Sequence, residues 1–183
     1  MRITGGQYRG RVLQTPKGKD VRPTTDKVRQ AIFNIINSYE MADEPYVLDG
    51  FCGTGALGLE ALSRFARGAV FIDKHPESLK FCGLNIDSIG AGDRAQTLRM
   101  DVSKAGIKPE KIEAADLLFL DPPYRKNLLV PALQSLSKNG WLADGALCVF
   151  ECEKDFTPDL PPQYEWRDDR VYGECKIIIA RYK

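Results

Sequence analysis

The chain has 183 residues, of which 43% are hydrophobic and 28% are charged. This composition is that of an ordinary globular domain and excludes a wholly disordered chain. No apolar run reaches the roughly 20 residues that span a bilayer, and the first residues lack the apolar stretch of a secretory signal, so we expect a cytoplasmic protein.

Charge is distributed unevenly along the chain. Residues 1–29 carry eight basic and two acidic side chains, a net charge of +6, and the remaining residues carry a net charge of −5. A basic arm on an acidic body favours a polyanionic partner, although a solvated tail would have the same composition.

The arm itself shows hairpin-like punctuation. Residues 2–13 contain short polar runs separated by glycines, which predicts a β-hairpin, and residues 16–23 form a connector rich in lysine and proline. We therefore assign 1–23 to a basic appendage and 24–183 to the main domain. Because the arm offers few core-like residues, we expect the domain to fold without residues 1–15.

A helix comes next, and then an alternation of strands and helices. Apolar residues at helical spacing predict a helix over 25–39, capped by Thr24 or Thr25. After Pro45 the alternation predicts a Rossmann-like α/β fold, a doubly wound and mostly parallel sheet that ends in an antiparallel hairpin. The expected strands are 46–48, 69–72, 95–100, 116–120, 146–151, 165–171 and 176–182, and the expected helices are 56–66, 76–89 and 127–138.

The first strand after Pro45 runs into a glycine-rich turn. Gly53, Gly55 and Gly58 match the pattern Gly-x-Gly-x-x-Gly, in which missing Cβ atoms let a ligand approach the backbone at a helix start. Asp73 ends the second strand 18 residues after Gly55, where a carboxylate can hold ribose hydroxyls. The pattern fits a dinucleotide or S-adenosylmethionine, and it also fits a turn that only packs a helix on a sheet.

A further carboxylate favours S-adenosylmethionine, and another offers a contact to adenine. Asp49 lies at the carboxyl end of the first strand, where it would repel a pyrophosphate but attract the ammonium and sulfonium charges of S-adenosylmethionine. Asp101 closes the third strand and could accept a hydrogen bond from the amino group of adenine.

A second motif follows the most apolar strand. Residues 117–120 run into Asp121, Pro122, Pro123 and Tyr124, at a strand end where such sheets bind ligands. The prolines fix the backbone, so the Asp121 carboxylate and the Pro122 carbonyl can accept both hydrogens of one NH₂ group. The Tyr124 ring offers a stacking face for a planar base, a role that needs the ring and not the hydroxyl. The two motifs together predict methyl transfer to an amino nitrogen.

These motifs resemble those of class I S-adenosylmethionine-dependent methyltransferases that act on amino nitrogens. Over nearly its whole length the chain resembles the bacterial 16S ribosomal RNA guanine-N2 methyltransferases of the RsmD type. The N-terminal segments are the most discriminating part. The matching segments are RITGGQYRGR at 2–11, RPTTDKVRQAIFN at 22–34, DGFCGTGALGLEALSR at 49–64, LDPPY at 120–124 and NGWLADGAL at 139–147.

The resemblance implies a monomer that uses S-adenosylmethionine and no metal, and that acts on ribosomal RNA within an assembling small ribosomal subunit. The family often has glutamate where this chain has Asp73, which shortens the ribose contact by one methylene. The implied cofactor ligands are Asp49, Gly53, Gly55, Asp73 and Asp101, the implied catalytic residues are Asp121, Pro122 and Tyr124, and the implied RNA-binding residues are Arg2, Arg9, Arg11 and Arg22.

Three other functions fit parts of the pattern. A DNA adenine-N6 methyltransferase would use the same Asp-Pro-Pro-Tyr turn, but the weak segment 102–115 is too short for a target-recognition domain. A non-catalytic RNA-binding protein of this fold would need neither Asp121 nor the glycines. A nicotinamide oxidoreductase is disfavoured by Asp49 and leaves the Asp-Pro-Pro-Tyr turn unexplained.

The cysteines favour a reducing compartment. Their number, five, is odd, and none has Cys-x-x-Cys spacing, so we expect reduced and mostly buried thiols. His75 is the only histidine, which disfavours a zinc site. Cys52 lies near a helix N-terminus, which would favour a reactive thiolate, although a small, inert, buried thiol fits the position equally well.

Overall fold

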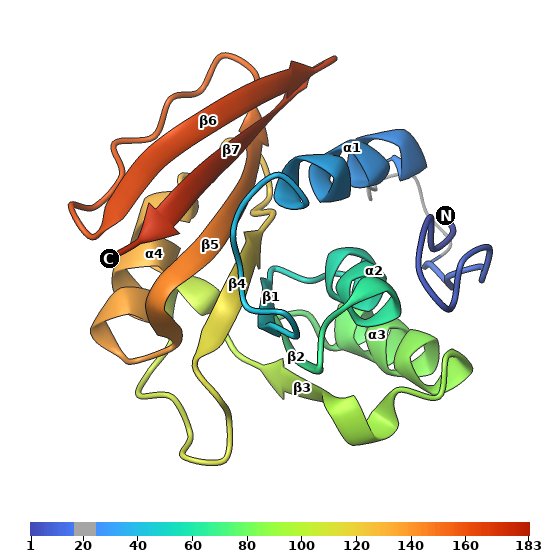
Figure 1. Cartoon of the computed structure of the whole chain (residues 1–183). Helices are drawn as coiled ribbons and strands as arrows, with labels where there is room; N and C mark the ends of the chain where they lie inside the picture. Colours follow the sequence, from blue (N-terminus) through green and yellow to red (C-terminus); the bar gives the residue numbers. More distant parts are fainter. Residues whose placement is uncertain (17–24) are drawn as a thin grey trace.

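The computed structural model describes residues 1–16 and 25–183, which are built around one seven-stranded sheet (Figure 1). The strands lie side by side in the order β3-β2-β1-β4-β5-β7-β6. The first five in this order are parallel, whereas β7 is antiparallel to both of its neighbours. The bounds are β1 Tyr46–Gly50, β2 Gly68–Asp73, β3 Ala95–Arg99, β4 Ala115–Leu120, β5 Leu142–Glu153, β6 Tyr164–Tyr172 and β7 Cys175–Tyr182.

Helices cover both faces of the sheet. Along β4, Leu117 and Phe119 belong to one core and Leu118 and Leu120 to the other, because successive side chains of a strand point to opposite faces. The first core is shared with α1, α2 and α3, and the second with α4 (Figure 1). The helices are α1 Asp26–Ile36, α2 Ala56–Arg64, α3 Pro76–Ser88 and α4 Leu129–Lys138.

This architecture confirms the predicted Rossmann-like sheet with its antiparallel C-terminal hairpin. Two elements differ in length from the prediction. Helix α1 begins after Thr25, whose side chain accepts a hydrogen bond from the Val28 amide, but it ends at Ile36, where the backbone turns. Strand β5 begins at Leu142, earlier than expected, because Asp144 and Gly145 interrupt its apolar pattern in the sequence.

The N-terminal segment does not form the predicted strands. A single antiparallel bridge joins Arg2 to Val12. Three backbone hydrogen bonds of 2.9–3.0 Å also join residues 1–3 to residues 10–13. Between these limbs, backbone donors bind α2: the Thr4 amide donates to the Glu60 carboxylate over 2.8 Å, and the Gln7 amide to the Ser63 carbonyl over 2.8 Å. The expected hairpin is therefore present only as a short antiparallel pairing, and it is held on α2.

This loop is part of the core. Ile3 and Leu13 are buried in the core that α1, α2 and α3 share, so the premise that the arm adds little to the core is wrong. The packing argues against folding of the domain without residues 1–15. The connector's residues 17–23, with Arg22 and the expected boundary at 23/24, and Thr24 lie outside the described residues.

Candidate active site

The predicted cofactor-binding and catalytic residues lie at the carboxyl edge of the parallel strands. Strands β1 and β4 are direct neighbours, with Gly50 opposite Leu120, so the glycine turn and the Asp-Pro-Pro-Tyr turn begin at the same level. Asp73 ends β2, which pairs with β1 on its other side. The topology thus brings together two motifs that lie about 70 residues apart in the sequence.

The glycines of the first turn have different roles. Gly55 is the N-cap of α2 with a φ of 83°, and a Cβ there would lie 2.7 Å from the Cys82 sulfur, so packing already requires glycine. Gly53 also has a positive φ, 54°, but a Cβ there would meet no atom within 4 Å. The backbone at Gly53 is therefore open to an approaching ligand, whereas Gly55 fits the helix onto the sheet.

Asp73 fastens this turn to the end of β2. One carboxylate oxygen accepts a hydrogen bond from the Gly53 amide (3.0 Å) and the other from the His75 amide (2.8 Å). The sequence predicted a ribose ligand here, and the structure adds a second role, since the same carboxylate holds the backbone of the glycine turn. Carboxylate oxygens have more than one acceptor site, so both roles are compatible.

Asp49 is a buried carboxylate beneath the turn. Its side chain accepts a hydrogen bond from the Gly58 amide over 2.8 Å, and the residue is 2% exposed. Burial and, to a smaller extent, the nearby charge of Asp73 raise the pKa of Asp49 to about 8, against the lowering effect of the Gly58 hydrogen bond. A cation bound beside Asp49 would offset this and favour the charged carboxylate.

Asp101 lies just after β3 and remains charged. Its side chain accepts hydrogen bonds from the Ser103 hydroxyl (2.6 Å) and the Ser103 amide (3.0 Å). The hydroxyl hydrogen bond is the main cause that lowers the pKa of Asp101. The carboxylate is half-buried at the same edge of the sheet, where it offers an acceptor.

The Asp-Pro-Pro-Tyr turn leads away from β4. Asp121 is half-buried, Pro122 is buried and Tyr124 is half-buried. The Tyr124 hydroxyl donates a hydrogen bond to the Glu151 carboxylate over 3.0 Å. Burial, together with the negative charge of Glu151, raises the pKa of Tyr124. Glu151 was not among the predicted site residues, although an acidic residue ending an apolar strand, residues 146–151, is a signal that could have found it.

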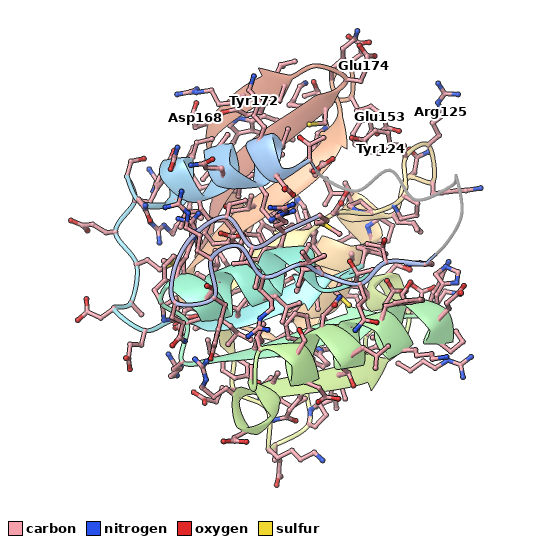
Figure 2. The ribbon with its side chains drawn as sticks, turned by 90° about the vertical axis from the view of Figure 1, so that its right-hand side faces the viewer. Tyr124, Arg125, Glu153, Asp168, Tyr172 and Glu174 are labelled. Carbon is pink, nitrogen blue, oxygen red and sulfur yellow. The ribbon has the colours of Figure 1, made fainter. Side chains whose placement is uncertain are left out.

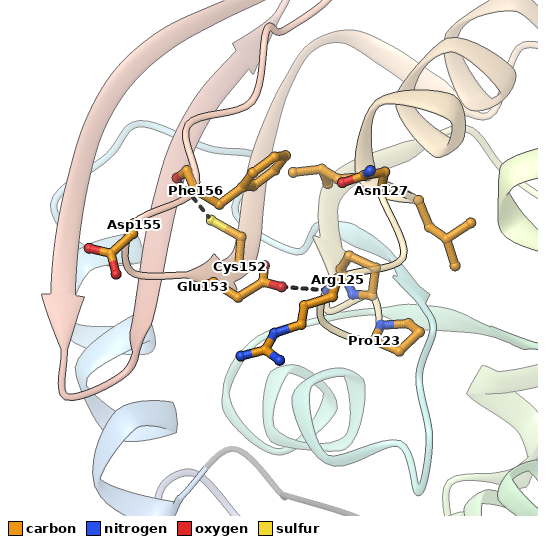
Figure 3. A pocket seen from close by; sticks show the side chains of 10 residues that line it. Pro123, Arg125, Asn127, Cys152, Glu153, Asp155 and Phe156 are labelled. Carbon is orange, nitrogen blue, oxygen red and sulfur yellow. Dashed lines mark hydrogen bonds between the residues drawn. The ribbon is translucent and has the colours of Figure 1, made fainter.

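The far side of the same turn borders a pocket of about 320 Å³ (Figure 3). The turn contributes one wall, and the segment after β5 contributes the other. The Arg125 amide of the turn donates to the carboxylate of Glu153, the last residue of β5, and this hydrogen bond joins the two walls. Figure 2 shows Tyr124, Arg125 and Glu153 together near one end of the sheet. The lining residues include Pro122, Pro123, Asn127, Cys152, Asp155 and Phe156.

Gln14 of the basic arm lies beside the glycine turn. The buried Asn85 side chain of α3 donates to the Gln14 carbonyl and to the Thr54 carbonyl, each over 3.0 Å, and it accepts from the Gln14 amide over 2.7 Å. Asn85, which sequence reasoning missed, therefore joins the arm to the turn. The side chains of Arg2, Arg9 and Arg11 are exposed on the arm.

All five cysteines are free and buried, as predicted. The idea of a reactive Cys52 is wrong. A hydrogen bond with Cys82 raises the pKa of the Cys52 thiol well above its usual value, and burial adds to this.

Two further features concern the described residues only. No group of three or more histidine, cysteine or acidic side chains among them is arranged to hold a metal ion. In the same ranges, no helix has the length and apolar character that crossing a membrane requires.

The chain is similar to known proteins over almost its whole length. It matches the family described as Conserved hypothetical protein 95 over residues 1–181. It is 36% identical to ribosomal RNA small subunit methyltransferase D of Escherichia coli K12, over 95% of this chain and 86% of that protein. The protein of the same name from Haemophilus influenzae Rd is 34% identical, over 94% and 89%.

A solved structure agrees with these matches. The Escherichia coli protein yhhF superposes with a TM-score of 0.83 and 34% identity, and the match covers 100% of this chain and 98% of that one. The chain therefore belongs to the Conserved hypothetical protein 95 family, the family of the RsmD-type methyltransferases.

Proposed function

We propose that the protein transfers a methyl group from S-adenosylmethionine to the exocyclic N2 of a guanine in 16S ribosomal RNA. The observation that carries this proposal is the side-by-side start of the two motifs, with Gly50 of β1 opposite Leu120 of β4. The family relationship supports ribosomal RNA as the substrate, because the relatives named above are ribosomal RNA methyltransferases.

The glycine turn fits S-adenosylmethionine. The open backbone at Gly53 and the buried Asp49 carboxylate both suit its methionine moiety. This moiety carries positive charges, which would pair with the Asp49 carboxylate. Gly55 would shape the turn, Asp73 would hold the ribose and Asp101 would accept from the adenine amino group. When bound, the sulfonium supplies an electrophilic methyl group.

The Asp-Pro-Pro-Tyr turn suits the target base. The Asp121 carboxylate and the Pro122 carbonyl would accept the hydrogens of the amine, which draws its lone pair out of conjugation and aims it at the methyl group. Stacking of the base on Tyr124 would contribute about 1–3 kcal/mol. As the nitrogen gains the methyl group, the bond from the sulfonium to the methyl would break and S-adenosylhomocysteine would leave as a neutral thioether. The nitrogen would lose one proton to water, through the acceptors that hold it, so the product amine is neutral.

The basic arm would contact the RNA backbone through Arg2, Arg9, Arg11 and Arg22. Gln14 of the arm lies beside the glycine turn, so RNA bound along the arm would reach the reaction site. We propose that the enzyme acts as a monomer in the cytoplasm on an assembling small subunit, and that binding weakens with salt because the contacts are to phosphates.

Product analysis tests the proposed function. Small subunits and naked 16S RNA that lack the modification are incubated with the protein and with S-adenosylmethionine carrying a labelled methyl group, and the nucleosides are then separated. We expect label in N2-methylguanosine. Label only in N6-methyladenosine would replace guanine by adenine as the target, and no transfer to either substrate would contradict the proposed enzyme.

The pKa of Asp49 predicts how cofactor binding depends on pH. The carboxylate is largely protonated below pH 8 in the free protein, and the bound cation favours its charged form, so binding releases a proton. Affinity for S-adenosylmethionine should therefore rise up to roughly tenfold per pH unit as pH increases towards 8, and then level off. Calorimetry in two buffers of different ionisation enthalpy measures the proton released.

The matched variant is Asp49→Asn, which keeps an acceptor for the Gly58 amide. Any pH dependence of binding that remains in this variant comes from the ionisable groups of the cofactor. The difference between the pH profiles of the two proteins therefore isolates the contribution of Asp49. The variant should bind more weakly at pH 8.

Because the folded-state pKa is raised, the wild type loses stability as pH rises from about 4 to about 8, and the variant should melt higher than the wild type at pH 8. Identical pH profiles of binding would contradict the assignment.

A further inference from the structure

A buried carboxylate lies directly behind the candidate stacking residue. Residues 147, 149, 151 and 153 of β5 share one face of the strand because side chains alternate. Leu147 and Val149 lie in the core that α1, α2 and α3 cover. Glu151 follows them as the first charged residue of this row, at the point where the row leaves the core. Its exposed fraction is only 8%.

Burial of this carboxylate calls for a functional or structural reason. A charged side chain out of water is costly unless it is hydrogen-bonded, and an apolar residue would continue the row at less cost. The Tyr124 hydroxyl donates to the Glu151 carboxylate over 3.0 Å, and a hydrogen bond to an ionised acceptor is stronger than one between neutral groups. The pair therefore fixes where the Tyr124 ring lies.

The backbone around Tyr124 is anchored in the same way. Residues 121–123 have neither helical nor strand structure, and Arg125 has a φ of 60°, in the left-handed region. The Arg125 amide donates to the carboxylate of Glu153, which lies on the same face of β5 as Glu151 (Figures 2 and 3). Two successive residues of the turn are thus held by two acidic residues at the end of one strand.

We infer that Glu151 is a positioning residue for the target base: through the Tyr124 hydroxyl it sets the plane of the stacking ring before RNA binds. This inference rests on the proposed function, in which Tyr124 stacks on the base. A ring already held in place spares the loss of rotamer freedom on binding and keeps the amine in line with the methyl group. The hydroxyl of Tyr124 matters for this reason, contrary to the expectation that only the ring is needed.

Methyl-transfer kinetics of four variants test the inference. Tyr124→Phe and Glu151→Ala each remove the hydrogen bond, and we expect kcat to fall about 10- to 100-fold in each. The KM for RNA should change less than kcat, since the stacking ring remains in both. Glu151→Gln keeps an acceptor oxygen and should restore kcat to within about threefold of the wild type. The double variant Tyr124→Phe/Glu151→Ala should be no slower than the slower single variant.

Tyr164→Phe is the matched control. The Tyr164 hydroxyl donates to the Leu133 carbonyl over 2.9 Å, on the α4 side of the sheet. Like Tyr124→Phe, this variant therefore removes one hydroxyl hydrogen bond, here from a buried tyrosine. We expect this variant to melt lower than the wild type and to keep its kcat. Thermal unfolding and S-adenosylmethionine affinity, measured for every variant, separate a loss of folding from a loss of positioning.

The outcomes distinguish this inference from the proposed function. Failure of the wild type to methylate RNA would overturn the proposed function itself. An active wild type with unchanged kcat in Tyr124→Phe would overturn only the role of Glu151. Multiplicative losses in the double variant, or a Glu151→Gln protein as slow as Glu151→Ala, would also overturn it, because both results require Glu151 to act independently of the hydroxyl.

Discussion

Replacing Asp121 by alanine should lower the rate of methyl transfer by roughly a thousandfold while the affinity for S-adenosylmethionine stays within a few fold. The expectation follows from the place of Asp121 after β4, in the turn that we propose to hold the base, whereas the proposed cofactor ligands lie at the ends of β1, β2 and β3. Without its carboxylate, one of the two acceptors that would hold the amine is lost. Single-turnover rates and binding calorimetry measure the two effects separately.

Asp121→Asn is the informative companion variant. Its amide keeps one acceptor oxygen but has no charge, so we expect a rate between those of the wild type and the alanine variant. If the alanine variant loses cofactor affinity as strongly as it loses rate, Asp121 belongs to the cofactor site and its assignment to the target amine is mistaken.

Replacing Glu60 by alanine should destabilise the fold by about 3–5 kcal/mol, the range for breaking a buried ion pair from one side. Glu60 is fully buried, and its carboxylate pairs with the equally buried Arg29 (3.3 Å) and with Arg64 (2.8 Å). The same carboxylate accepts from the amides of Thr4 and Gly5 over 2.8 and 2.7 Å. The variant would leave a buried guanidinium and two backbone donors without this partner. Denaturant unfolding measures the loss.

Glu113→Ala is the matched control for Glu60. Glu113 also pairs with an arginine, Arg67, over 2.8 Å, but both side chains are largely exposed. Such surface pairs contribute about 0–1 kcal/mol, so we expect little change in the unfolding midpoint. Equal losses of unfolding free energy in the two variants would mean that Glu60 and its arginine partners do not anchor the arm.

The sequence predicted those features that local patterns determine. Alternating apolar segments showed the order of strands and helices, and the two motifs predicted which strand ends carry the site. Glu60 and Glu151 were missed because their partners are distant in sequence: Thr4 lies 56 residues from Glu60, and Tyr124 lies 27 residues from Glu151. No periodicity or spacing reveals such a contact.

The errors had a related cause. Glycine and charge in residues 2–13 indicated an exposed hairpin, but two apolar residues, Ile3 and Leu13, are enough to dock the segment once α2 offers acceptors for its backbone. For Cys52, reasoning from a nearby helix terminus gave the wrong direction, because burial and Cys82 determine the thiol's environment. The assignments to cofactor, base and RNA remain predictions.

The position of β7 determines the order in which a nascent chain can acquire its sheet. β7 lies between β5 and β6, although both are synthesised before it. Until β7 emerges from the ribosome, one edge of β5 is unpaired and β6 has no strand partner in the sheet. β7 also supplies Ile177 and Ile179 to one core and Ile178 to the other. Neither layer of the core can therefore be complete before this strand has been made.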